Sequence, residues 1–262
     1  RSKVALRMAV LFVGCAVVPL IGLTLLTIGE TTAALQEQAQ GRLHHDVKAA
    51  AMGALERLSL LEETLRLVGA SIDGAPRAST PPAVERLGQT LGTAAPSLAY
   101  FPIRGPMRAI RGELELPTLT EAQRSHLGNA GQLVVSVTSS AGPAHVLLVR
   151  VDVPGGGGTA AAAVNHRALF ELDDDQLPPI SDLCLIENSR ALACSAGAPG
   201  DVVRQISSVT LDRDSADSMS GRFLVDHWTI PLKARYGAEP WTAVMMRPEA
   251  ALLEPLHRFV RT

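Results

Sequence analysis

The chain begins with an unbroken apolar run. From Met8 to Gly29 no residue is charged. A helix over this run, at about 1.5 Å per residue, would be roughly 33 Å long and would cross the hydrocarbon core of a bilayer. Basic residues occur within positions 1–7, and the next one is Arg42. Because Lys and Arg collect on the cytoplasmic side, we expect a cytoplasmic flank at 1–7 and a transmembrane helix at 8–29.

The remainder of the chain is then expected in the periplasm, tethered to a bacterial inner membrane. A cleaved signal peptide is the alternative interpretation of the same run. Signal peptides have a shorter apolar core and a small-residue cleavage site, and Thr27–Glu30 offers no such site. The pattern therefore favours an anchor.

The next segment, residues 30–74, has the pattern of a long stalk helix. It contains no proline, and its apolar positions recur in alternating steps of four and three, which is a heptad seam. The seam residues are Val47, Ala51, Ala54, Leu58, Leu61, Leu65, Val68 and Ile72. Such a seam favours a homodimer, whereas Leu55, Leu60 and Leu67 widen the apolar surface and favour packing on the helix's own domain. Both interpretations stay open.

Beyond Pro76 the pattern changes to short strands separated by turn residues, which predicts an α+β domain. We expect a membrane-distal unit at 75–175, a membrane-proximal unit at 176–247 and an exit helix at 248–262. Thr120 and Gln123 fit a capping box that opens a helix. The strands are expected at 97–103, 132–138, 145–152, 159–164, 182–187, 191–195, 221–226, 228–234 and 241–246.

Composition and motifs give no support for catalysis. The formal net charge is −2 and there is no basic block, so a nucleic-acid partner is not expected. The seven histidines are scattered, without the i, i+4 pair and neighbouring Glu of a helical zinc site. The glycines at 155–158 lack the following Lys of a phosphate-binding loop and are interpreted as a hairpin loop. We therefore expect no enzyme activity in this portion, no metal and no cofactor.

Cys184 and Cys194 lie outside the apolar run, where an oxidising compartment allows a disulfide. A three-residue turn at Asn188–Arg190 would place them directly opposite each other in a hairpin. A two-residue turn at Asn188 and Ser189 would instead pair Cys184 with Ala193. The alternative to a disulfide is that both are small core residues.

Three segments carry a resemblance to a known family. They are Leu119–Gln123 with His126, Leu127 and Gly131; Ser181–Glu187 with Leu192–Ser195; and Trp241–Val244 with Arg247–Ala250, Leu253–Leu256 and Phe259. Together with the order of elements, they resemble the double Cache sensors of bacterial membrane receptors, in the subgroup that precedes diguanylate cyclase or cyclic-di-GMP phosphodiesterase domains. The resemblance implies two PAS-like antiparallel sheets after a long helix, and an output domain beyond Thr262.

The resemblance also implies a small-molecule ligand. Amino-acid-binding Cache sensors carry a Tyr/Arg/Trp/Asp set in the distal unit, but this chain has 2 tyrosines in all and no Trp before position 228, so that set does not carry over. Ligands of small sheet domains lie between the sheet and its covering loops, and an arginine there pairs with a carboxylate through its fork. The candidate ligand-binding residues of the distal unit are Tyr100, Arg104, His126, Arg150 and Asn165.

The function predicted from these observations is ligand sensing outside the cytoplasm, with a conformational signal passed to a cytoplasmic output. The alternative is a membrane-anchored scaffold that presents the β-rich domain to a partner without signalling. The coding sequence downstream of Thr262 separates the two, because a second span and an enzyme domain there support the sensor.

Overall fold

The computed structural model describes residues 3–73, 84, 91–139, 142–154, 156–172, 181–208, 215–218 and 221–251. The chain divides into two compact units, one of Arg1–Arg42 with Leu252–Thr262 and one of Leu43–Ala251. One helix, α1 (Lys3–Asp73), includes residues of both. Within the described residues, no helix combines the length and the apolar character needed to cross a membrane. The separate membrane helix expected at 8–29 is therefore not found, and these positions belong to α1.

The first sheet of the unit Leu43–Ala251 is antiparallel, in the order β2-β1-β5-β4-β3. Its strands are β1 (Leu98–Pro102), β2 (Arg108–Arg111), β3 (Gln132–Ser139), β4 (Gly142–Val153) and β5 (Gly156–Val164). Helix α3 (Glu121–Ala130) precedes β3, and the capping box predicted at its start is present, with Thr120 and Gln123 each satisfying the other's backbone N–H. Helix α4 (His166–Leu169) follows β5.

The second sheet has the order β7-β6-β10-β9-β8. Its strands are β6 (Asp182–Glu187), β7 (Arg190–Cys194), β8 (Ser215–Ser218), β9 (Gly221–Ile230) and β10 (Trp241–Pro248). Each sheet thus has its second strand at one edge, followed by its first, fifth, fourth and third. Helices α5 (Gly200–Ser208) and α6 (Lys233–Tyr236) belong to this part, and α5 packs Val202 and Ile206 into the sheet's core.

Some elements differ from those expected. Strands β2 and β8 and helix α5 lie in segments for which no element is predicted. The two strands have four residues each, too few for a clear period, and α5 covers Gly200–Ser208. The two strands expected at 221–226 and 228–234 are one strand, β9, which no Gly or Pro interrupts. It ends at Ile230, before Pro231, and Lys233 already belongs to α6. Of the exit helix expected at 248–262, positions 252–262 lie outside the described residues, and Pro248 ends β10.

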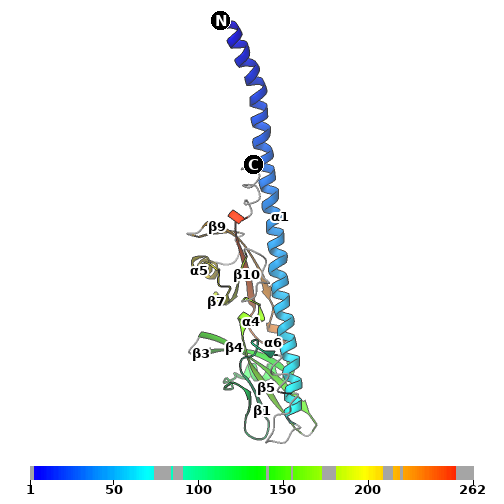
Figure 1. The fold of residues 1–262 in the computed structure, drawn as a ribbon. Coiled ribbons are helices and arrows are strands. Elements are labelled where there is room, and N and C mark those ends of the chain that lie inside the picture. Colours follow the sequence, from blue (N-terminus) through cyan, green and yellow to red (C-terminus); the bar gives the residue numbers. More distant parts are fainter. Residues whose placement is uncertain are drawn as a thin grey trace. The chain divides into compact units, whose positions relative to one another are not determined.

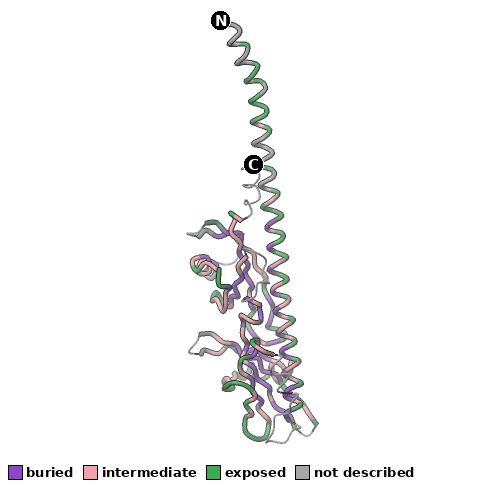
Figure 2. The backbone as a smooth tube through the Cα atoms, viewed as in Figure 1, coloured by how far each residue is buried: buried purple, intermediate pink, exposed green. Residues whose placement is uncertain are grey.

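The heptad seam of α1 is buried within this chain. All eight seam residues are 0–3% exposed, and Figure 2 shows buried positions recurring along the helix beside the sheets. Apolar residues this deeply covered in one copy are not available to a second copy. The expectation that these eight positions form a dimer seam is therefore corrected: they pack on the chain's own sheets, which the wide apolar stripe allowed.

From Leu43 to Asp73, α1 lies alongside both sheets (Figure 1). Near its start, Asp46 is 3.6 Å from the guanidinium of Arg247 on β10. Near its end, Gly69 approaches β4 so closely that an added Cβ would lie 2.5 Å from Cγ2 of Val151. One helix therefore contacts the proximal sheet first and the distal sheet afterwards.

Cys184 and Cys194 form a disulfide between β6 and β7, with Cα atoms 4.1 Å apart. The turn has two residues, Asn188 and Ser189, both with positive φ, as a tight hairpin of the favoured type requires. A bulge between Leu185 and Ile186 shifts the register, so that Cys184 faces Cys194 instead of Ala193. The cysteines therefore face each other as a three-residue turn would have placed them, but the extra residue lies in the bulge and not in the turn.

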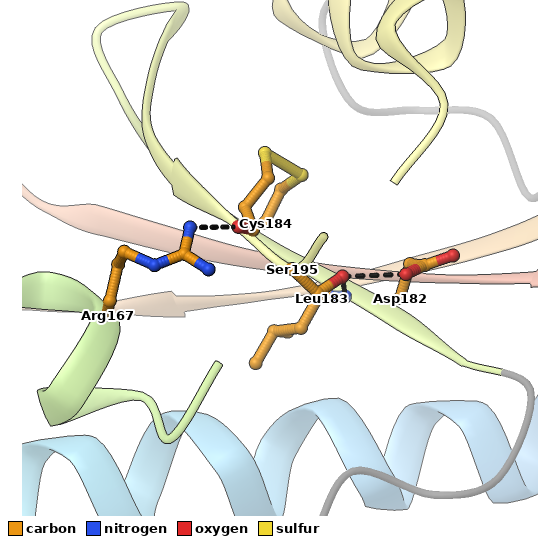
Figure 3. The surroundings of a disulfide bond; sticks show 6 residues. Arg167, Asp182, Leu183, Cys184 and Ser195 are labelled. Atoms are coloured by element: carbon orange, nitrogen blue, oxygen red, sulfur yellow. Dashed lines mark hydrogen bonds between the residues drawn. A yellow bond between two sulfur atoms is a disulfide. The ribbon is translucent and has the colours of Figure 1, made fainter. Parts of the chain in front are cut away.

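Hydrogen bonds join the residues around the disulfide to neighbouring elements (Figure 3). Arg167 on α4 donates from Nη1 to the carbonyl oxygen of Cys194 at 2.8 Å. Ser195 donates from Oγ to Oδ1 of Asp182 at 2.7 Å and accepts from the backbone N–H of Leu183 at 3.2 Å. These bonds fix the outer strand β7 to β6 and to α4.

Candidate functional site

A cavity of about 300 Å³ lies at the β1–β2 end of the distal sheet. It is formed where β1 leaves the sheet, turns through residues 103–107 and returns as β2. The lining residues are Tyr100, Pro102, Arg104, Gly105, Pro106, Met107 and Arg108. A loop that closes over a sheet edge is a common place for a small-molecule site.

Tyr100 forms the inner wall of the cavity. Its side chain is 1% exposed, and its strand β1 is paired on both sides, with β2 and β5. An added Cβ at Gly69 would lie 3.3 Å from the ring, and one at Gly158 would lie 2.8 Å from the hydroxyl. Glycine at 158 thus lets β5 pass close to this hydroxyl. The hairpin loop predicted at 155–158 is shorter than expected, because Gly156–Gly158 belong to β5 and pair with Val151–Val153 of β4.

The two arginines of the cavity differ in what they bind. Arg108 donates from Nη1 to the carbonyl oxygen of Ile72 at 3.0 Å, and so joins β2 to the last turn of α1. Arg104 is exposed and makes no hydrogen bond or ion pair with another described residue. Its guanidinium is available for a bidentate contact with an anion. Among the described lining residues none is acidic, so the cavity offers positive charge alone.

Three of the five residues proposed from the sequence lie elsewhere. His126 on α3 is 3.2 Å, through Nε2, from the carbonyl oxygen of Arg235. Arg150 donates to the carboxylate of Asp152 at 2.9 Å and to the carbonyl oxygen of Gly128. Both therefore fasten neighbouring segments of the fold.

Asn165 is the N-cap of α4 and accepts from the backbone N–H groups of Arg167 and Ala168. Only Tyr100 and Arg104 share the cavity. Met107 and Arg108 also line the cavity but are not among the residues proposed from the sequence. Met107 belongs to the turn before β2, and Arg108 begins the unpredicted strand β2. Their signal was the alternation from Arg108 to Arg111, which is too short to separate from a loop.

Comparison with known proteins gives a clear result for the fold only. The sequence matches no protein-family model, and no curated protein matches it. Its structure is similar to the sensory domain of the Campylobacter jejuni chemoreceptor Tlp3 (CcmL), with a TM-score of 0.58 and 11% identity over 86% of this chain and 99% of that chain. The likeness is one of fold.

Further structures agree with this result. The ligand-binding domain of the Pseudomonas fluorescens chemoreceptor CtaA in complex with L-isoleucine has a TM-score of 0.57 and 10% identity, over 86% of this chain and 98% of that chain. The Tlp3 ligand-binding domain in complex with L-valine has a TM-score of 0.55 and 11% identity, over 85% and 97%. The long helix and two antiparallel sheets are thus the architecture of chemoreceptor sensory domains.

Proposed function

We propose that this chain is an extracytoplasmic ligand-sensing module of a bacterial signalling receptor. The observation that carries the proposal is the cavity of about 300 Å³ beside a buried tyrosine and the available guanidinium of Arg104. The fold likeness to chemoreceptor sensory domains supports it. The disulfide between Cys184 and Cys194 supports a location outside the cytoplasm, where such bonds persist.

The lining of the cavity favours a small carboxylate as the ligand. Arg104 supplies a fork for the carboxylate, and Pro102, Pro106 and Met107 supply contacts for a compact apolar body. An α-ammonium group is held most strongly by a carboxylate, through a charge-assisted hydrogen bond, and the described lining contains no Asp or Glu. We therefore place carboxylic acids without an ammonium group ahead of amino acids such as the L-valine and L-isoleucine that accompany the similar domains.

Arg108 offers a route from the cavity to α1. It lines the cavity and its Nη1 is 3.0 Å from the carbonyl oxygen of Ile72. A ligand that repositions the turn at 103–107 would change this contact, and thereby the balance between conformations of the helix end. The signal in this proposal is a population shift at the junction of α1 with β2.

A titration of the full chain tests the proposal. Propionate, isobutyrate, succinate, L-valine and L-isoleucine are each titrated by calorimetry, with wild type, Arg104→Ala and Arg124→Ala. Arg124 is an exposed arginine on α3 that pairs with Glu121, so it is the matched control.

We expect one of the carboxylates to bind. Arg104→Ala should weaken that binding by at least about 10-fold, since a charge-assisted bidentate contact is lost, and Arg124→Ala should leave it unchanged. Binding of none of the five compounds, or equal binding by all three proteins, would contradict the proposal.

The class of the cytoplasmic output domain is proposed from the sequence resemblance alone. We propose that the signal controls cyclic-di-GMP turnover by a cytoplasmic domain encoded beyond Thr262. The coding sequence downstream of Thr262 tests this directly. An output domain of another class would remove this part and leave the ligand proposal standing.

A further inference from the structure

A second polar site lies at the junction between the two sheets, away from the cavity. We call it the junction cluster. The distal sheet contributes Ser136 on β3 and His145 on β4, helix α4 contributes His166, and the proximal sheet contributes Glu187 on β6 and Trp241 on β10. Helix α4 lies between the two sheets (Figure 1). The side chains of His145 and Trp241 are 0% and 1% exposed.

Hydrogen bonds across this junction converge on Glu187. Its carboxylate accepts from Nε1 of Trp241 at 3.2 Å and lies 3.0 Å from Nε2 of His145. Ser136 Oγ is 3.0 Å from the same His145 nitrogen. A carboxylate only accepts, so His145 carries its hydrogen on Nε2. One acidic side chain of the proximal sheet thus holds an imidazole of the distal sheet.

The two imidazoles are also in contact with each other. Their ring centroids are 4.8 Å apart, and each ring packs edge-to-face on Trp241 at 5.2 Å. His145 Nδ1 and His166 Nε2 are buried with no hydrogen-bond partner among the described residues. A proton added at either nitrogen would create a buried N–H donor without an acceptor, which costs free energy. Protons on both rings would place two positive charges side by side.

We propose that the junction cluster is an acid-sensitive contact, in which protonation of His166 weakens the attachment of one sheet to the other. This goes beyond the proposed ligand-binding function and does not depend on it. The cluster shares no residue with the cavity.

The pKa values of His166 and Glu187 are shifted in the directions that this geometry requires. Burial, and then the neighbouring His145, lower the pKa of His166 to about 4, against the opposing pull of Glu187. Burial by itself would raise the pKa of Glu187, but the hydrogen bond and charge of His145 and the Trp241 hydrogen bond outweigh it, so that pKa is lowered. Both groups therefore resist protonation while the junction is closed.

Other charged groups nearby are directed elsewhere. Arg167 on α4 donates to the carbonyl oxygen of Cys194. Arg57 on α1 donates to the carbonyl oxygen of Leu169 and pairs with Glu171. Arg190 faces Glu187 across the hairpin and is exposed. None of these groups forms a hydrogen bond with an imidazole of the cluster.

The direction of the pH effect depends on the two states of His166. In an open or unfolded state its pKa is near the ordinary value of about 6.5, whereas in the closed junction it is about 4. Between these values the open state binds the extra proton, so stability falls as the pH falls from about 6.5 towards 4 and is constant above it. From pH 7.5 to 5 the unfolding equilibrium constant should rise about 30-fold through this residue alone.

The test compares urea unfolding of the full chain at pH 7.5 and pH 5 for wild type, His166→Phe and His45→Phe. Phenylalanine retains the ring contacts with Trp241 and cannot take a proton. His45, which is exposed on α1, is the matched control. We expect the unfolding equilibrium constant of wild type and of His45→Phe to show the full rise from pH 7.5 to pH 5. The rise for His166→Phe should be about 30-fold smaller.

A histidine NMR titration of the wild type gives a second measurement that does not depend on a variant folding. The His166 ring should remain neutral down to pH 5, while an exposed histidine titrates near pH 6.5. Titration of His166 near pH 6.5, or the same acid response in His166→Phe as in wild type, would overturn the proposal. If His166→Phe does not fold, the NMR titration decides.

Discussion

Glu62 is the most informative position for a test of how α1 is held to its domain. Its side chain is buried, with 4% exposed, yet it accepts three hydrogen bonds. Arg66 and Arg235 each donate from Nη2 at 2.9 Å. The hydroxyl of Tyr236 donates at 3.2 Å. Because Arg235 and Tyr236 belong to α6, this carboxylate joins α1 to the proximal part of the fold.

The substitution Glu62→Gln keeps the size of the side chain and removes its charge. The two arginines are 40% and 50% exposed, so water continues to solvate them, and the cost is smaller than for a fully buried ion pair. The buried Tyr236 hydroxyl retains Ser59 at 3.3 Å. Burial is the main cause that raises the pKa of Tyr236, so its hydroxyl remains a donor. We expect a loss of about 2 kcal/mol in the free energy of unfolding.

Thermal unfolding followed by circular dichroism measures this loss. For a unit of this size about 2 kcal/mol lowers Tm by about 4–8 °C. Glu63→Gln is the matched control, because Glu63 pairs with the same Arg66 at 2.7 Å but is 60% exposed. It should change the free energy of unfolding by less than about 1 kcal/mol. Equal Tm values for the two variants would refute the reasoning that burial of Glu62 makes its contacts matter.

Two further predictions concern close packing and the disulfide. Gly69→Ala should destabilise the protein by about 1–3 kcal/mol in urea unfolding, because its Cβ would lie 2.5 Å from Val151, although alanine favours helices. The double variant with Val151→Ala should recover stability. A stable single variant would contradict the prediction. Replacing Cys184 and Cys194 by serine should cost about 2–3 kcal/mol, given the short loop that the bond closes. Non-reducing mass spectrometry checks the pairing, and two alkylatable thiols in the wild type would rule it out.

The amino-acid sequence by itself determined the features that depend on neighbours in the chain. Thr120 and Gln123 lie three positions apart, so their capping box is a local fact. The heptad pattern correctly marked which face of α1 is apolar, and all of its positions are buried. The turn residues between β6 and β7 indicated a hairpin, although its turn length and bulge were not visible in the pattern.

Only the tertiary structure decided which buried surfaces meet. An apolar seam has no directional preference, since burial is favourable against any apolar partner, so the pattern of α1 left a second helix and its own sheets open. The cavity needed the return of β2 beside β1, and of the five proposed residues it collects Tyr100 and Arg104. His145 meets Glu187 across 42 positions of sequence, and Trp241 meets it across 54. Sequence periodicity does not predict these contacts, because they arise from how the two sheets pack together.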